Sequence, residues 1–143
     1  MKKPKLIMLE GPDKVGKTTI YQALRRNTNY GPLVIDRFLA SNWVYDSFYH
    51  RQNPHIVNYL KIEKKMKKTF DCYLILLICK KSSMQKRIEM SNEQLLQTHT
   101  SIDDVVGLFD RYFGGSTFNK IKINTDESLV SCVYQIKEFI GEK

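Results

Sequence analysis

The chain has 143 residues, a length typical of one domain with its own core, and no repeat or linker divides it. Hydrophobic residues make up 42% and charged residues 27%, which excludes a disordered or low-complexity chain. The net charge of +8 leaves two classes of partner open, nucleic acids and anionic small molecules. No stretch is long and apolar enough to cross a membrane.

The three cysteines are an odd number and lack the spacing of a metal site. Cys72 and Cys79 bound an apolar run, so we expect buried thiols and a reducing, cytosolic setting. The chain enters its first predicted strand within a few residues, so we expect no signal peptide.

The first predicted strand covers residues 6–9, an apolar run followed at once by Gly11-x-x-x-x-Gly16-Lys17-Thr18. This spacing fits the phosphate-loop pattern at every fixed position, and the segment from Thr19 onward is patterned as a helix. The alternative is a chance match in a glycine-containing turn, and the flanking strand and helix argue against it.

The residue types of this motif have a chemical reason. Gly11 and Gly16 let the backbone curl so that N–H groups point at an anion, and the helix that follows adds its positive dipole end. Lys17, which we expect to face solvent without a ligand, can reach the outer phosphates of a nucleoside triphosphate. The Thr18 hydroxyl is placed to coordinate Mg²⁺.

Strands and helices alternate along the rest of the chain. The unbroken apolar run at 72–79 predicts a central parallel strand covered on both faces. The polar stretch 91–101 is a candidate lid, and the lysine cluster at 61–68 indicates a solvated helix face in preference to a nucleic-acid patch. The other predicted elements are a helix ending near 27–31, a strand at 33–36, a helix at 42–51, a helix starting at Pro54, a helix capped by Ser82 or Ser83, a helix at 103–112 stopped by Gly114 and Gly115, a strand at 119–123, and a terminal helix at 129–140 followed by Gly141.

This order of elements predicts an α/β fold with four parallel strands in the order 2-1-3-4, flanked by helices. Ligands of such sheets bind beyond the C-terminal strand ends, where the phosphate loop and Asp36–Arg37 both fall. A strand ending in Asp36 can place a carboxylate near the Mg²⁺. Arg37 can clamp a second phosphate with its guanidinium fork; a surface ion pair at a strand end is the alternative.

Two segments resemble the thymidylate kinases and the wider group of P-loop deoxynucleotide kinases. Residues 9–19, Leu-Glu-Gly-Pro-Asp-Lys-Val-Gly-Lys-Thr-Thr, are similar to that family's phosphate loop, including its inner aspartate. Residues 36–45, Asp-Arg-Phe-Leu-Ala-Ser-Asn-Trp-Val-Tyr, are similar to its Asp-Arg-Tyr segment with a downstream serine and tyrosine. Residues 84–88 match the start of its lid helix more loosely. The resemblance implies the three-layer P-loop kinase fold in one domain, 1–143, with a lid around 84–101. It also implies ATP- and Mg²⁺-dependent phosphoryl transfer to a (deoxy)nucleoside monophosphate.

The resemblance also implies roles for single residues. Lys17, Arg37 and Arg87 would be the catalytic side chains, with Arg37 on the acceptor phosphate and Arg87 approaching ATP from the lid. Thr18 and Asp36 would hold Mg²⁺. Three further sets follow: the ATP phosphates on Asp13, Lys14, Val15, Gly16, Lys17, Thr18 and Thr19; the acceptor on Asp13, Arg37, Phe38, Ser41, Tyr45 and Asp46; and the adenine beside Arg87 and the loop that carries Asn124, Thr125 and Asp126.

The chain departs from the family pattern at three places. Only residues 27–32 separate the first helix from the Asp-Arg strand, so an acceptor-binding arginine and an aromatic base contact are missing. Ser91 stands where the lid has a second arginine, and Asp46 stands where the base pocket has Gln. An ionised carboxylate matches the N1–H and amino group of guanine better than the edge of thymine. We therefore predict that a guanine monophosphate is a better acceptor than thymidylate, the alternative being that Asp46 points to solvent.

Two other functions stay open. A deoxynucleoside kinase would phosphorylate a 5′-hydroxyl and would need a general base, for which Glu10 and Asp36 are the nearby carboxylates. A non-catalytic nucleotide-binding protein descended from a kinase would fit the missing segment and the +8 charge. The expected partners are nucleotide substrates and no membrane; nucleic acid is not expected, and a homodimer is left open.

Overall fold

The computed structural model describes residues 2–12, 14–27, 32–49, 55–91 and 99–142. Its elements in chain order are β1 (Lys5–Glu10), α1 (Lys17–Asn27), β2 (Leu33–Asp36), α2 (Leu39–Phe48), α3 (Ile56–Thr69), β3 (Asp71–Ile78), α4 (Lys81–Ser91), α5 (His99–Gly115), β4 (Asn119–Asn124) and α6 (Leu129–Ile140). Among these described helices, none combines the length and the apolar character that crossing a membrane requires.

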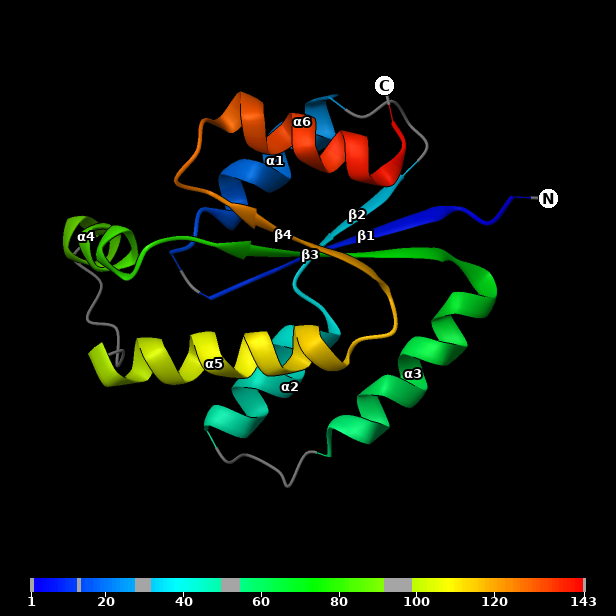
Figure 1. Cartoon of the computed structure of the whole chain (residues 1–143), viewed down its shortest axis with the longest axis horizontal. Coiled ribbons are helices and arrows are strands. Elements are labelled where there is room, and N and C mark those ends of the chain that lie inside the picture. The colour runs from blue at the N-terminus through cyan, green and yellow to red at the C-terminus, as the bar shows by residue number, and fades with distance from the viewer. Residues whose placement is uncertain (1, 13, 28–31, 50–54, 92–98, 143) are drawn as a thin grey trace.

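The four strands form one parallel sheet in the order β2-β1-β3-β4. The predicted α/β fold and its strand order are therefore confirmed. Helices α1 and α6 cover one face of the sheet, and α2, α3 and α5 cover the other, which gives three layers (Figure 1). Helix α4 lies beyond the C-terminal end of β3, while both chain termini lie toward the opposite edge (Figure 1).

Alternation along the strands divides the core between the two faces. Leu6 and Met8 of β1 pack with α2 and α5, whereas Ile7 and Leu9 pack with α1 and α6. The central strand β3 is buried on both sides in the same way, as its unbroken apolar sequence predicted. Glu10 follows Met8 by two residues, so its side chain lies on the face that α2 and α5 cover.

Helix boundaries are where the structure departs from the sequence prediction. Helix α2 starts at Leu39, three residues before the predicted start at 42, because a carboxylate from β1 caps it, as described below. Helix α5 starts at His99, so the last three residues of the predicted lid, 91–101, are helical. The positions 92–98 and Pro54 lie outside the described residues.

Helix α5 also includes Gly114 and Gly115, which were predicted to follow its end. Its final carbonyl groups accept hydrogen bonds from the Lys120 ammonium, at 2.7 Å for Phe113 and 3.3 Å for Gly114. The helix therefore continues because its carbonyl end is satisfied by a side chain from β4.

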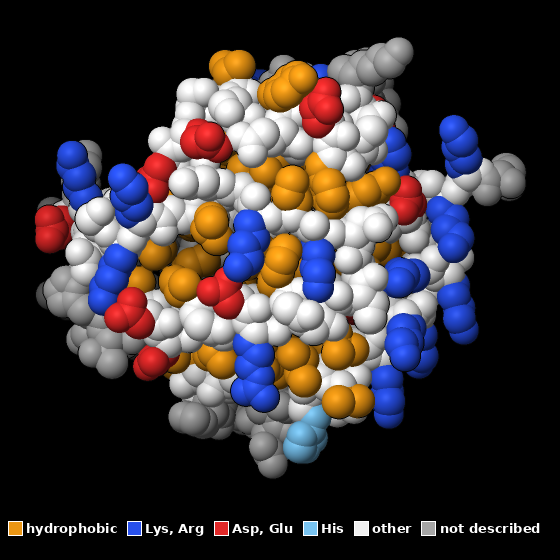
Figure 2. Space-filling model, viewed as in Figure 1, with side chains coloured by type: hydrophobic (Ala, Val, Ile, Leu, Met, Phe, Trp, Pro, Cys, Tyr) orange, Lys and Arg blue, Asp and Glu red, His pale blue; other side chains and the backbone are white. Residues whose placement is uncertain are grey.

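Positive charge is concentrated at the edge of the sheet where the strands begin. The lysines of the 61–68 cluster are exposed on α3, as predicted. Figure 2 shows Lys and Arg side chains gathered at the right-hand end, where Figure 1 places the N-terminus and the end of α3. A hollow of about 530 Å³ at this edge is lined by Lys2, Lys3, Lys5 and Lys67 among others.

Candidate active site

The phosphate loop joins the end of β1, at Glu10, to the start of α1, at Lys17, at the C-terminal edge of the sheet. Gly11 and Gly16 have φ angles of 155° and 99°, which side chains disfavour. A Cβ at Gly11 would lie 2.8 Å from the Leu77 carbonyl oxygen, so no larger residue fits there. The curled backbone that the motif predicted is therefore present, although Asp13 lies outside the described residues.

Lys17 is buried, with 6% of its surface exposed, so the prediction that it faces solvent without a ligand is wrong. Its ammonium donates to the Gly11 carbonyl at 3.1 Å and lies 4.0 Å from the Asp36 carboxylate. A buried ammonium needs a partner, and the Gly11 carbonyl and the Asp36 carboxylate serve as partners here. These contacts hold the Lys17 ammonium beside the phosphate loop, where an anion would bind.

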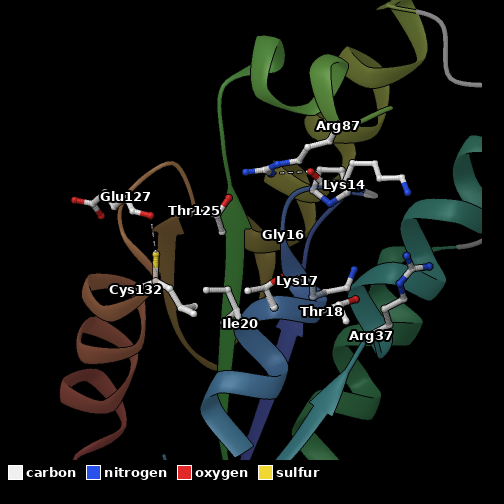
Figure 3. Close-up of a pocket in the computed structure, with 13 residues that line it drawn as sticks. Lys14, Gly16, Lys17, Thr18, Ile20, Arg37, Arg87, Thr125, Glu127 and Cys132 are labelled. Carbon is white, nitrogen blue, oxygen red and sulfur yellow. Dashed lines mark hydrogen bonds between the residues drawn. The ribbon is translucent and has the colours of Figure 1, made fainter. Parts of the chain in front are cut away.

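A cavity of about 810 Å³ opens over the phosphate loop. Figure 3 shows Lys17 and Thr18 directed into this space, Arg87 reaching over it from α4, and Arg37 approaching from the end of β2. The structure therefore brings together the three side chains predicted as catalytic. The lining consists of Pro12, Lys14, Gly16, Lys17, Thr18, Thr19, Ile20, Arg37, Arg87, Thr125, Glu127, Leu129 and Cys132.

The predicted metal ligands lie beside this cavity. Thr18 is exposed at the first turn of α1, and Asp36 is the last residue of β2. In the described ranges no three His, Cys, Asp or Glu side chains form a metal cluster. A cation here would therefore draw on one hydroxyl and one carboxylate, with phosphate oxygens and water for its other positions, which is usual for Mg²⁺.

Arg87 ties α4 to the phosphate loop. Its guanidinium donates to the Lys14 carbonyl at 2.8 Å (Figure 3). It also donates to the Cys79 sulfur at 3.7 Å. The Thr125 hydroxyl donates to the Val15 carbonyl from the loop after β4. Two of the residues predicted beside adenine, Arg87 and Thr125, thus border the cavity and hold adjacent carbonyls of the phosphate loop.

The other two residues predicted beside adenine hold the backbone. The Asn124 side chain accepts from the Asp126 N–H at 2.9 Å. Asp126 accepts from the Lys80 N–H at 2.8 Å and from the Ser83 hydroxyl at 2.7 Å, and these bonds lower the pKa of its carboxyl. Asp126 therefore fastens the start of α4, the helix that carries Arg87.

Arg37 sits in a strained turn between β2 and α2. Its φ is 67°, and Lys14 is the other non-glycine residue with positive φ in the described ranges. Such a conformation costs roughly 1–3 kcal/mol and is concentrated at functional sites. The guanidinium carbon lies 6.0 Å from the ring centroid of Tyr45, a cation–π contact that directs the side chain along α2.

The remaining acceptor-side predictions fall on α2 and its cap. Phe38 and Tyr45 are half-buried against the core, and Asp46 accepts from the Tyr59 hydroxyl at 3.3 Å. Ser41 is buried and its hydroxyl donates to Glu10. The cavity lining includes Arg37 but none of these four predicted residues.

Among the helical residues of the cavity lining, sequence reasoning missed Ile20, Leu129 and Cys132. Ile20 lies one turn into α1, and the other two lie in the first turn of α6. Their apolar character looked like ordinary helix patterning, and only the packing of α1 against α6 shows that they also border the cavity.

Comparisons with known proteins support the fold alone. No protein-family model matches the chain, and no curated protein sequence matches it. The YorR protein of Bacillus subtilis, solved in complex with phosphorylated GDP, is 20% identical over 96% of each chain, with a TM-score of 0.78. Deoxyadenosine kinase from M. mycoides with bound dCTP is 12% identical over 95% of this chain and 98% of that chain, with a TM-score of 0.69. Thymidylate kinase from Candida albicans is 14% identical over 97% of this chain and 92% of that chain, with a TM-score of 0.58. The chain has the fold of the P-loop kinases.

Proposed function

We propose that the chain is an ATP- and Mg²⁺-dependent kinase, one domain over residues 1–143, that phosphorylates a (deoxy)nucleoside monophosphate. The observation that carries this is the position of Arg37, which lines the same cavity as the phosphate loop. A monophosphate acceptor presents an anion at that place, and a guanidinium is suited to an anion. A cytoplasmic location belongs to the same proposal and is supported by three free thiols.

The chain's residues fit ATP with Mg²⁺. The curled loop and the start of α1 offer backbone N–H groups to phosphates, and Lys17 lies at the mouth of this cradle. Thr18 and Asp36 would hold the Mg²⁺, which when bound neutralises phosphate charge. The apolar side chains of Ile20 and Leu129 would face the donor base beside Thr125.

Three cations would stabilise the transfer. Lys17 would exchange the Gly11 carbonyl for the phosphates, Arg37 would hold the acceptor phosphate in line, and Arg87 would meet the donor from the α4 side. The reaction needs no covalent intermediate, because positioned charge is sufficient for phosphoryl transfer.

A deoxynucleoside kinase is the second candidate, and the surroundings of Glu10 weigh against it. Glu10 is 1% exposed and accepts hydrogen bonds from the Phe38 N–H and from both donors of Ser41. Burial raises the pKa of its carboxyl, and these bonds and Lys17 oppose that rise. A carboxylate engaged in this way is not free to accept a substrate proton, so Asp36 is left as the candidate base.

The acceptor base belongs to the proposal as well. A carboxylate at Asp46 favours guanine, since it accepts from two adjacent donors of that base. A guanine nucleotide is also what the Bacillus subtilis structure holds. We therefore place GMP or dGMP ahead of thymidylate as the acceptor.

A panel of acceptors tests the proposal. The chain is incubated with ATP, Mg²⁺ and one acceptor at a time, and ADP release is measured. We expect release with monophosphates and none with nucleosides. Release with nucleosides alone would identify a nucleoside kinase, and binding of ATP without release would identify a non-catalytic nucleotide-binding protein.

Lys17 provides the matching variant test. Because Lys17 is buried, Lys17→Met, which keeps the side-chain volume, is compared with Lys17→Ala. Both variants should lose transfer by about a hundredfold or more, since each removes a positive charge from the phosphates. Unfolding curves control for lost structure. Activity of Lys17→Met within about threefold of the parent would mean a barrier change under about 0.7 kcal/mol and would contradict the mechanism.

A further inference from the structure

The turn that carries Arg37 is held from β1. Arg37 has a left-handed backbone, which a non-glycine residue keeps only when its neighbours fix it. Its N–H donates to the Leu9 carbonyl at 3.0 Å. The next residue, Phe38, donates its N–H to one carboxylate oxygen of Glu10. Ser41 donates its N–H to the other oxygen at 2.7 Å and its hydroxyl at 2.6 Å.

These bonds replace a cap that the helix itself lacks. Phe38 occupies the N-cap of α2, and its side chain cannot accept a hydrogen bond. The first turn of α2 has no acidic residue of its own. The carboxylate of Glu10 therefore satisfies the free N–H groups and faces the positive end of the helix dipole.

Glu10 is also connected to the phosphate loop through its own backbone. It is the last residue of β1, and Gly11, which follows it, opens the phosphate loop. The Gly11 carbonyl accepts from Lys17 at 3.1 Å. One residue thus starts the loop proposed for the donor phosphates with its backbone and holds the turn of Arg37 with its side chain.

We propose that Glu10 is a positioning residue that sets Arg37 at a fixed place relative to the phosphate loop. This inference rests on the proposed function, in which Arg37 holds the acceptor phosphate. Loosening the Glu10 contacts releases the strained turn, so the Arg37 guanidinium is no longer held in place. The phosphate loop keeps its conformation, because its own glycines determine it. The acceptor step is then impaired far more than ATP binding.

The chain contains a matched control for this test. Glu63 on α3 is also a buried carboxylate, with 0% exposure, and it also accepts from a buried serine, Ser116, at 2.8 Å. It accepts from the Thr117 N–H at 2.8 Å as well. This pair fastens the segment between α5 and β4, at the other edge of the sheet, and no residue of it lines the cavity.

The experiment compares Glu10→Gln and Ser41→Ala with Glu63→Gln and Ser116→Ala. An amide at position 10 can accept with one oxygen only, and its NH₂ group opposes a second N–H. We expect Glu10→Gln to lower kcat/KM for the acceptor by roughly ten- to a hundredfold, with KM for ATP within about threefold, because small displacements of a substrate-positioning group have effects of this size. Ser41→Ala, which keeps both backbone bonds, should give a smaller loss in the same direction. The two control variants should lower thermal stability without changing either constant.

A second measurement does not need activity. Amide hydrogen exchange at Phe38 and Ser41 should accelerate in Glu10→Gln at least tenfold and stay unchanged in Glu63→Gln. Equal kinetic effects of the Glu10 and Glu63 variants, or equal losses for acceptor and ATP, would overturn the positioning role. If the parent chain transfers to no acceptor, the proposed function fails. The claim that Glu10 holds the turn is then decided by the exchange rates, and unchanged rates at both amides overturn it.

Discussion

The sheet has a C-terminal edge, where its parallel strands end, and an N-terminal edge, where they begin. The same kind of contact fastens both edges, but the helices beside them present opposite ends of their backbone. At the C-terminal edge, Glu10 accepts from Ser41 at the start of α2. At the N-terminal edge, Glu63 accepts from Ser116 after the end of α5. Both glutamates and both serines are buried, so a buried carboxylate–hydroxyl hydrogen bond fastens each edge.

The difference lies in what surrounds these pairs. Helices α1 and α6 start at the C-terminal edge, and their first turns line the cavity together with Arg37 and Arg87. The positive ends of these two helix dipoles therefore lie at the cavity. Helices α3 and α5 end at the other edge, so their last carbonyl groups lie there, and lysines donate to them. Lys3 donates to the Lys67 carbonyl at 2.7 Å. Lys120 donates to the Phe113 and Gly114 carbonyls in the last turn of α5 and to the Ser116 carbonyl just after it. Positively charged side chains therefore have different surroundings at the two edges. At the C-terminal edge they line a cavity suited to an anion, and at the N-terminal edge Lys3 and Lys120 bind the carbonyl ends of helices.

The largest effect is expected from a substitution in the cavity at the C-terminal edge. Arg37→Ala should lower kcat/KM for the acceptor by about a hundred- to a thousandfold, since it removes the charge proposed for the acceptor phosphate. KM for ATP should change by no more than about threefold. Steady-state kinetics with each substrate varied in turn measures both effects.

Arg111 is the matched control for that variant. Its guanidinium carbon lies 5.9 Å from the ring centroid of Trp43, as that of Arg37 lies 6.0 Å from Tyr45. Both arginines thus stack on an aromatic residue of α2, but Arg111 is absent from the cavity lining. Arg111→Ala should leave both constants unchanged. Equal losses for the two arginines would mean that the aromatic contact, and not the phosphate, accounts for the role of Arg37.

The next prediction tests whether the base of the acceptor nucleotide, which we propose to bind at the C-terminal edge, contacts Asp46. Asp46 is half-buried and contacts the Tyr59 hydroxyl. Asp46→Asn restores an amide that can donate and accept, so the ratio of kcat/KM for dGMP to that for thymidylate should fall by about tenfold. Tyr59→Phe, which removes only the hydroxyl that Asp46 accepts from, is the control for packing. An unchanged ratio in Asp46→Asn would mean that Asp46 does not contact the base.

The sheet and the phosphate loop could be predicted because their signals are local. The apolar run of β3 and the spacing of Gly11, Gly16 and Lys17 are read directly from neighbouring residues. The strand order followed from right-handed crossovers, and the structure confirms it. These features depend little on which distant residues come together.

The start of α2 could not be predicted because its cap comes from another strand. Phe38 and Leu39 carry no helix-start signal, and Glu10 lies 28 residues before Phe38. The burial of Lys17 was missed for a related reason, since its partners, the Gly11 carbonyl and Asp36, become neighbours only after the strands pair. Contacts of this kind connect the site to the scaffold, and sequence periodicity does not record them.

The smallest expected effect tests the other edge. Lys120 and Lys122 both place their ammonium 5.2 Å from the Phe113 ring. Lys120 donates to carbonyls at the end of α5, whereas Lys122 forms an exposed ion pair with Asp110 at 2.8 Å. Lys120→Met should lower the free energy of unfolding by about 1 kcal/mol, and Lys122→Met by less, because exposed ion pairs contribute little.

Denaturant unfolding of the two variants and transfer assays on both decide the matter. Neither substitution should change kcat or KM, since neither lysine lines the cavity. Binding of a single-stranded oligonucleotide at low salt is measured in parallel, because a polyanion site at this edge would weaken with each lysine removed. If both variants lose oligonucleotide binding equally while stability stays unchanged, the lysines of this edge serve a ligand. A stability loss confined to Lys120→Met would instead mean that this lysine is there for the carbonyl ends of the helix, and the two edges would differ in function as they differ in backbone polarity.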